Sequence, residues 1–206
     1  MARGSLKLTG YDRGVFINCP FDRAYRPLLE ALVFTVLACG FVPRSALEID
    51  DSNQIRLEKI AALIGGCRLG VHDISRTDTS SPGGLPRFNV PLELGGFLFV
   101  QRLGLPAQRR KRALILDSEP SRYRNFISDI AGQDIKAHDN EPARVIAAVR
   151  DFLSGTGESI LPGGRTLQRR FADFAAKCRR SARTLAWTPM RRHLPNIDGL
   201  FSTGLR

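Results

Sequence analysis

The sequence predicts an α/β fold in which a parallel sheet carries helices on both faces. Short apolar runs alternate with longer segments whose apolar residues recur every three or four positions, and turn-forming residues separate the two kinds. The 206 residues are 43% hydrophobic and 25% charged, which excludes a mainly disordered, collagen-like or coiled-coil chain. No apolar run reaches the roughly 20 residues of a membrane-spanning helix, so no membrane span is expected.

Five segments are predicted to be strands because they are short, mostly apolar and bounded by turn-forming residues. Pro43 follows the second segment and makes it an imperfect strand, because proline lacks the N–H that a sheet ladder uses. The predicted strands are residues 15–18, 41–42, 69–74 and 113–117, with a weak fifth strand around Ile135.

Five helices are predicted from apolar residues at helical spacing. Gly40 follows the first helix in the usual C-cap position. The predicted helices are residues 25–39, 53–64, 92–103, 122–131 and 142–153. If the strands are ordered 2-1-3-4-5, the fold is flavodoxin-like, and its ligand site lies beyond the carboxyl ends of strands one and three.

Positive charge is concentrated near the end of the chain. Lys and Arg number 31 against 20 Asp and Glu, which gives a net charge of +11. From Ser154 onward there are ten Lys or Arg and three Asp or Glu, a net charge of +7, and Gly-rich turns occupy residues 155–157 and 162–164. We therefore predict an α/β domain over residues 1–153 and a basic, mainly helical extension over residues 154–206.

The extension is predicted to contain a helix over residues 165–187, with Leu167, Phe171 and Phe174 on one stripe and most arginines off it. Three functions stay open. The stripe packs on the domain or on a second copy of the chain, the arginines bind the phosphates of a nucleic acid, or the helix contacts a membrane surface or an acidic partner protein. Without a base-reading motif, nucleic acid binding would show little sequence preference.

The four cysteines are too widely spaced for a disulfide framework or a zinc site. The first residues hold no apolar run that would serve as a signal peptide. These observations predict a cytoplasmic protein, and no metal or cofactor is expected. Cys19 is interpreted as a small buried residue rather than a nucleophile, His72 as a structural residue of a buried strand, and His138 as a loop residue without functional meaning.

Polar and aromatic side chains follow strands one and three, at the predicted ligand site. Asp73 ends an otherwise apolar strand, although an aspartate at that position is also a common turn or cap residue. Phe21 offers an aromatic face to a ligand. The candidate ligand contacts are Asn18, Pro20, Phe21 and Asp22 after strand one, and Asp73, Ser75 and Arg76 after strand three.

Glu93 and Asn89 lie near the start of the third predicted helix, where Gly95-Gly96 would let the helix backbone approach the sheet or a ligand closely. A carboxylate near a helix start is also a favourable partner of the helix dipole, so a structural role for Glu93 stays open. Asp129, in the polar segment after the fourth strand, either reaches the ligand or belongs to a solvated helix face.

Two motifs, VHDIS at residues 71–75 and NV-x-x-ELG at residues 89–95, together resemble those of the Toll/interleukin-receptor-like (TIR-like) and nucleoside 2-deoxyribosyltransferase-like superfamily. VFINCPF at residues 15–21 is similar to the first strand of the deoxyribosyltransferases, where a Pro-Phe turn follows. The resemblance covers about residues 15–153. The loop between the two motifs is longer than in compact members, and Pro91 stands where those members have an aromatic or polar residue.

The resemblance implies an N-glycosidase that cleaves NAD or a related nucleotide as its substrate. Cleavage of the N-glycosidic bond builds positive charge on the sugar, and a carboxylate beneath the anomeric carbon stabilises or attacks that centre. Glu93 matches this carboxylate, Asp73 would hold the ribose or the base, and Phe21 would stack on the base.

The same resemblance implies self-association and a role as an antiviral defence effector. Two alternatives remain. One is a nucleoside deoxyribosyltransferase, which exchanges bases, and the other is a non-catalytic TIR-like module that senses a nucleotide or binds a partner protein.

Overall fold

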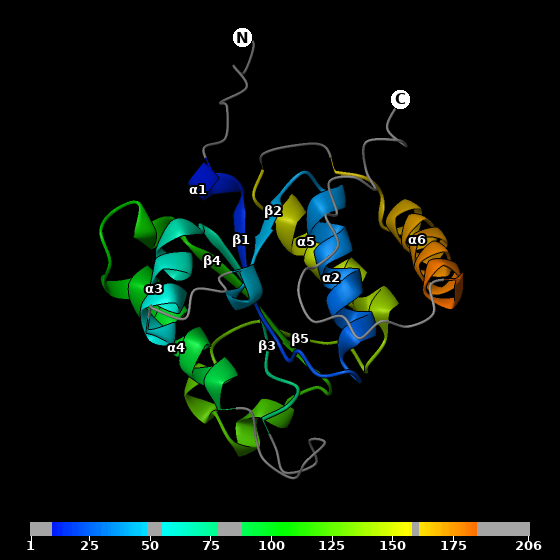
Figure 1. Cartoon of the computed structure of the whole chain (residues 1–206). Helices are drawn as coiled ribbons and strands as arrows, with labels where there is room; N and C mark the ends of the chain where they lie inside the picture. The colour runs from blue at the N-terminus through cyan, green and yellow to red at the C-terminus, as the bar shows by residue number, and fades with distance from the viewer. Residues whose placement is uncertain (1–9, 49–54, 78–87, 158–160, 185–206) are drawn as a thin grey trace. The chain divides into compact units, whose positions relative to one another are not determined.

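The computed structural model describes residues 10–48, 55–77, 88–157 and 161–184 (Figure 1). In this part of the chain, five strands form one parallel sheet in the order β2-β1-β3-β4-β5, which confirms the predicted flavodoxin-like sheet and has the strand order assumed for it. After β1 the chain adds β2 on one side and then crosses to add β3 on the other. The arrangement is flavodoxin-like, and its switch point lies between β1 and β3.

The central strands β1 and β3 are buried along their whole length. A parallel strand covered on both faces must be apolar at successive positions, so these two strands are the clearest in the sequence. Asn18 is paired with His72, which brings Asn18 and Asp73 out at the same edge of the sheet. The strands are β1 (Gly14–Asn18), β2 (Val42–Arg44), β3 (Leu69–Asp73), β4 (Arg112–Asp117) and β5 (Ile135–Ala137).

Helices cover both faces of the sheet, as Figure 1 shows. The helices α3 and α4 lie side by side on one face, and α2 and α5 pack together on the other. Short 3₁₀ turns η1 to η4 occupy Ala46–Glu48, Gln108–Arg110, Arg122–Asn125 and Ser128–Ile130. The helices are α1 (Gly10–Arg13), α2 (Arg26–Ala38), α3 (Arg56–Gly66), α4 (Asn89–Leu103), α5 (Pro142–Ser154) and α6 (Gly164–Thr184).

The edge position of β2 explains how a strand accommodates Pro43. Pro43 is paired with Val15 of β1, and β2 has no further strand on its other side in the described sheet. An edge strand tolerates a residue that cannot donate to a ladder. The observed strand therefore continues through the proline, whereas the sequence predicted only residues 41–42.

The segment after β4 is not the helix that was predicted over residues 122–131. It forms the two separate turns η3 and η4 instead. Ser121, just before η3, has a left-handed backbone with φ of 61°, and Phe126, just after it, leaves the helical region with φ of −143°. Tyr123 is buried against the cluster around Ile74 and Ile115, so the apolar residues of this segment pack without forming a helix.

By internal contacts the chain divides into residues 1–168 and residues 169–206. The first turn of α6 belongs to the first unit, because Leu167 is fully buried and Gln168 Nε2 donates to the Ala143 carbonyl of α5 at 3.3 Å. The predicted end of this helix, residues 185–187, lies outside the described residues. The domain boundary between residues 153 and 154 stays a prediction.

The imidazole of His72 lies fully buried between two aromatic rings. Its ring centroid is 5.8 Å from that of Phe16 and 4.9 Å from that of Phe97, both edge-on. The Asn18 amide donates to Nδ1 at 3.1 Å, so the ring proton of the neutral form is on Nε2. Burial, with the charge of Lys111 as a second cause, lowers the pKa of His72 to about 3. The predicted structural role of His72 agrees with this environment.

We expect acid to destabilise the fold through His72. The unfolded chain takes up a proton at this histidine below about pH 6.5, and the folded chain resists until about pH 3. The free energy of unfolding should therefore fall as the pH decreases through this window, by on the order of 5 kcal/mol in full. Urea unfolding between pH 7 and pH 4 measures this slope. A His72→Phe variant should show a flatter slope, and equal slopes in the two proteins would contradict the assignment.

Candidate active site

Glu93 lies in the second turn of α4, near the carboxyl edge of the sheet. Its side chain is buried, with 8% of the residue exposed, and among the described residues it has no hydrogen bond or ion pair. A carboxylate that caps a helix would accept a backbone N–H. In the described structure Glu93 accepts none, so the structural role that the sequence left open for it is not that of a hydrogen-bonded cap.

Burial raises the pKa of Glu93, and the nearby charge of Arg56, at the start of α3, opposes that effect. A desolvated carboxylate gains more from a positive charge in contact with it than an exposed one does, because the surrounding dielectric is lower. The site is therefore suited to stabilise a cationic group brought against Glu93.

Three carboxylates act electrostatically on the buried thiol of Cys19. Burial raises the pKa of this thiol, and the charges of Asp73, Glu93 and Asp22 raise it further. The thiol thus stays protonated at neutral pH, as expected for a structural cysteine. Glu93, Asp73 and Asp22 are thus all close enough to this thiol to act on it electrostatically, and their contacts with a ligand stay predictions.

Asn18 joins β1 to the beginning of α4. Its amide nitrogen donates to the Val90 carbonyl at 2.8 Å and to His72 Nδ1 at 3.1 Å, and the residue is 2% exposed. Val90 is three residues before Glu93 on the same helix. Asn18 therefore fixes the helical turn that carries Glu93, and both amide protons are used within the protein.

Asp73 is fully buried at the end of β3, where its two oxygens have different partners. Oδ1 accepts the Ser75 N–H at 2.9 Å in a local turn, and Oδ2 accepts the Tyr25 hydroxyl at 2.5 Å and lies 3.0 Å from His138 Nε2. Burial opposes ionisation of Asp73, but the contacts from His138, Ser75 and Tyr25 outweigh it and lower its pKa. The turn role considered from the sequence is present, and the predicted substrate contact of Asp73 stays a prediction.

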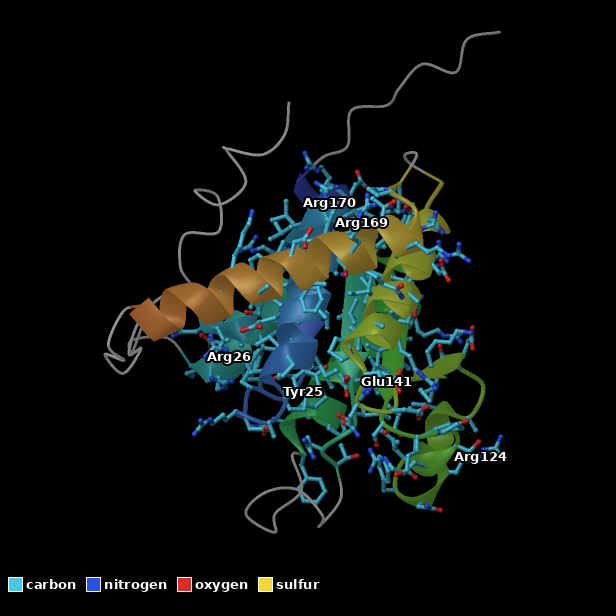
Figure 2. All side chains as sticks on the ribbon, turned by 90° about the vertical axis from the view of Figure 1, so that its right-hand side faces the viewer. Tyr25, Arg26, Arg124, Glu141, Arg169 and Arg170 are labelled. Carbon is cyan, nitrogen blue, oxygen red and sulfur yellow. The ribbon has the colours of Figure 1, made fainter. Side chains whose placement is uncertain are left out.

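Sequence reasoning placed His138 on a loop, which is confirmed, but it missed the contact of His138 with Asp73 and the contact of Tyr25 with the same carboxylate. His138 follows β5, is fully buried and accepts the Asn140 N–H on Nδ1, so its neutral form carries a proton on Nε2, facing Asp73. Tyr25 precedes α2 (Figure 2) and is also fully buried. The carboxyl end of β5 lies at the same edge of the sheet as the ends of the other strands. A search for polar residues directly after every strand would therefore have identified His138.

A buried ion pair joins the ends of β3 and β4. Asp117 Oδ1 accepts Arg122 Nε at 2.8 Å, and Arg122 Nη2 donates to the Ile74 carbonyl at 2.8 Å. Burial raises the pKa of Asp117 despite this partner, and the charge of Asp73 raises it further. Asp117 ends an apolar strand just as Asp73 does, so the same sequence pattern would have identified it.

The remaining predicted contacts differ in exposure. Phe21 is 39% exposed and is open to a ligand, whereas Pro20 and Ser75 are buried. Asp22 Oδ1 accepts the Tyr25 N–H, and Asp22 Oδ2 lies 3.9 Å from Arg76 Nε, so Asp22 and Arg76 lie close together at the switch point.

Asn89 begins α4 and is exposed. Asp129 is exposed on η4 and has no interaction with the other candidates among the described residues.

An apolar groove of about 500 Å³ is lined by residues of α3 and α4. Leu57, Ile60 and Ile64 line it from α3, and Leu92, Gly96 and Phe99 line it from α4. Glu93 is the one ionisable residue among the described residues that line it. In the described ranges, no group of three or more His, Cys, Asp or Glu residues is placed to hold a metal ion.

The comparisons with known proteins include a structural similarity to TIR domains. No protein-family model matches the sequence, and no curated protein matches it significantly. The chain is similar to the TIR domains in a structure of the activated Roq1 resistosome directly recognizing the pathogen effector XopQ, with 13% identity, a TM-score of 0.40, and coverage of 79% of this chain and 99% of that chain. A TM-score of 0.40 is too low to transfer a family or a function to this chain.

Among the described helices, none is both long enough and apolar enough to cross a membrane. Cys19, Cys39 and Cys67 are buried thiols.

Proposed function

We propose that this protein is an N-glycosidase that cleaves the bond between base and ribose in NAD or a related nucleotide, with Glu93 as the catalytic carboxylate. The observation that carries the proposal is the state of Glu93. It is buried, has no hydrogen bond or ion pair among the described residues, and lies beside the switch point where ligands of this sheet topology bind. A buried ionisable group without a structural partner is a candidate for chemistry.

The chemistry needs a negative charge where the sugar becomes positive. As the N-glycosidic bond breaks, its electron pair leaves with the base and the anomeric carbon becomes cationic. The Glu93 carboxylate stabilises that centre or forms a covalent bond to it, and water then supplies the hydroxyl of the product ribose. The low local dielectric strengthens this stabilisation relative to the same interaction in water.

The other candidate residues would orient the substrate. Phe21 is exposed enough to stack on a base, and Asp22 with Arg76 would contact the ribose or the phosphates. Asn18 and Asp73 would act indirectly, since the Asn18 amide protons and both Asp73 oxygens already form contacts within the protein. We also propose a cytoplasmic location and a role as a nucleotide-depleting defence effector that works as an assembly.

Release of free base tests the proposal directly. The full chain is incubated at several concentrations with NAD and with a panel of nucleosides, and products are separated by chromatography. Nicotinamide release from NAD supports the proposal. Base exchange that requires a second added base would support a deoxyribosyltransferase instead. Saturable nucleotide binding without any release, at every concentration tested, would overturn the proposal in favour of a non-catalytic module.

The basic extension is proposed to bind phosphates or to drive assembly. Arg169 and Arg170 lie on α6 (Figure 2), and Arg169 is exposed. Phe171 and Phe174 are neighbours on the same helix, with ring centroids 6.3 Å apart. A helix with an apolar stripe and arginines off it can use the two sides for different contacts.

We expect the full chain to retard DNA or RNA in a gel, with affinity that falls steeply as salt increases. Replacing Arg169, Arg170, Arg179 and Arg180 by Gln should weaken this binding by more than tenfold, and light scattering then reports whether the molar mass is kept. A chain truncated after Gln168 is the control, since residues 1–168 form one unit. Unchanged retardation by the four-site variant would exclude the phosphate interpretation.

A further inference from the structure

The groove between α3 and α4 has an unusual lining for a protein surface. Three of its side chains are large, apolar and mainly exposed: Leu57 at 61%, Leu92 at 63% and Phe99 at 67%. Isolated exposed apolar residues are common, but several around one concave surface mark a binding site. The volume of about 500 Å³ is within the range of small-molecule sites.

Glu93 gives this groove a charge requirement. It is the one ionisable residue among the described lining residues, and no described residue pairs with it. Arg56 acts on it electrostatically but forms no ion pair with it in the described structure. An anionic ligand would meet the carboxylate unfavourably, and a neutral one would leave its charge without a partner. A ligand with an apolar body and one positive group would satisfy both features.

We infer that the α3/α4 groove is a binding site for an organic ammonium ion whose apolar body lies on Leu57, Leu92 and Phe99 and whose charged group pairs with Glu93. This goes beyond the proposed function, because binding in the groove requires the charge of Glu93 but no glycosidic bond. Among ligands of equal size and shape, we therefore expect the positively charged one to bind most tightly.

Gly95 allows the groove to be filled without disturbing the fold. A Cβ added at Gly95 would meet no atom within 4 Å, and the residue lines the groove. Gly95→Leu should therefore occupy the groove while it improves the helix propensity of α4. Gly66, at the end of α3, also has nothing within 4 Å of an added Cβ and is not among the lining residues. Gly66→Leu is the matched control.

The test uses three probes of the same shape: 3-phenylpropylamine, 3-phenylpropanol and 3-phenylpropanoate, titrated into the full chain by calorimetry at neutral pH. We expect the amine to bind about 10- to 100-fold more tightly than the alcohol, since a charge-assisted hydrogen bond accounts for a ratio of that size. Glu93→Gln should reduce the ratio to near one. Gly95→Leu should weaken amine binding at least tenfold, and Gly66→Leu should leave it unchanged.

Equal affinity for amine and alcohol in the unmodified chain would overturn the inference, and so would a preference for the amine that survives in Glu93→Gln. No heat from any probe, in a protein whose melting is normal, would overturn it as well. The outcome is separate from that of the base-release assay. Amine binding without base release would support this inference and contradict the proposed function. Base release without amine binding would support the proposed function and contradict this inference.

Discussion

The Glu93→Gln variant is expected to lose base release by about 10³-fold or more, while its melting temperature stays within a few degrees of that of the unmodified protein. Glutamine keeps the shape of the side chain but cannot stabilise a cationic sugar. Because Glu93 has no hydrogen bond or ion pair among the described residues, its charge contributes no contact that folding would lose. The measurement is the initial rate of base release per folded molecule, together with thermal melting of both proteins.

Glu58→Gln is the control for this variant. Glu58 is an exposed carboxylate on the neighbouring helix α3, so its replacement should leave both rate and melting unchanged. A large fall in the melting temperature of Glu93→Gln, with the rate per folded molecule preserved, would show that Glu93 is a structural residue.

The Asp73→Ala variant is expected to lose about 3–5 kcal/mol of unfolding free energy. The substitution removes the acceptor of the Tyr25 hydroxyl and of the Ser75 N–H, and it leaves His138 Nε2 without its neighbour. Tyr25, Asp73 and His138 are all fully buried, so water cannot replace the lost acceptor without opening the core. Urea unfolding measures the loss.

Asp129→Ala serves as the comparison, because this aspartate is exposed and should change stability by no more than about 0.5 kcal/mol. A loss at Asp73 as small as the loss at Asp129 would mean that the buried cluster contributes little to folding. Asp73→Asn keeps the volume of the side chain, so its stability separates the effect of lost charge from that of lost shape.

The parallel sheet could be predicted because buried parallel strands are apolar throughout. Val15 to Ile17 and Leu69 to Val71 are apolar or Gly at every position, and their alternation with helices predicts that the strands are parallel. The order of the strands was an assumption, because alternation alone is compatible with several orders. The segment after β4 could not be predicted in the same way. Tyr123, Ile127 and Ile130 are spaced as they would be on one face of a helix, which is why a helix was predicted there. The left-handed backbone at Ser121, just before the turn, appears only in the folded chain and has no signal in the spacing.

The candidate site was predictable in part for a related reason. Asn18, Asp22, Asp73 and Glu93 lie near strand ends or a helix start, positions that topology places together whatever the side chains do. Their roles depend on burial, which sequence spacing does not give. His138 has Ala137 and Asp139 as its chain neighbours, and only packing beneath the sheet edge makes it a partner of Asp73.

The double hydrogen bond of Asn18 has a consequence for how mutations at this site should be interpreted. A scan that ranks residues by lost activity would place Asn18 among the essential ones, because its replacement releases the turn of α4 that holds Glu93. Yet its amide has no proton left for a ligand. Loss of turnover with unchanged substrate affinity, rather than weaker binding, would distinguish such an anchoring residue from one that contacts the nucleotide.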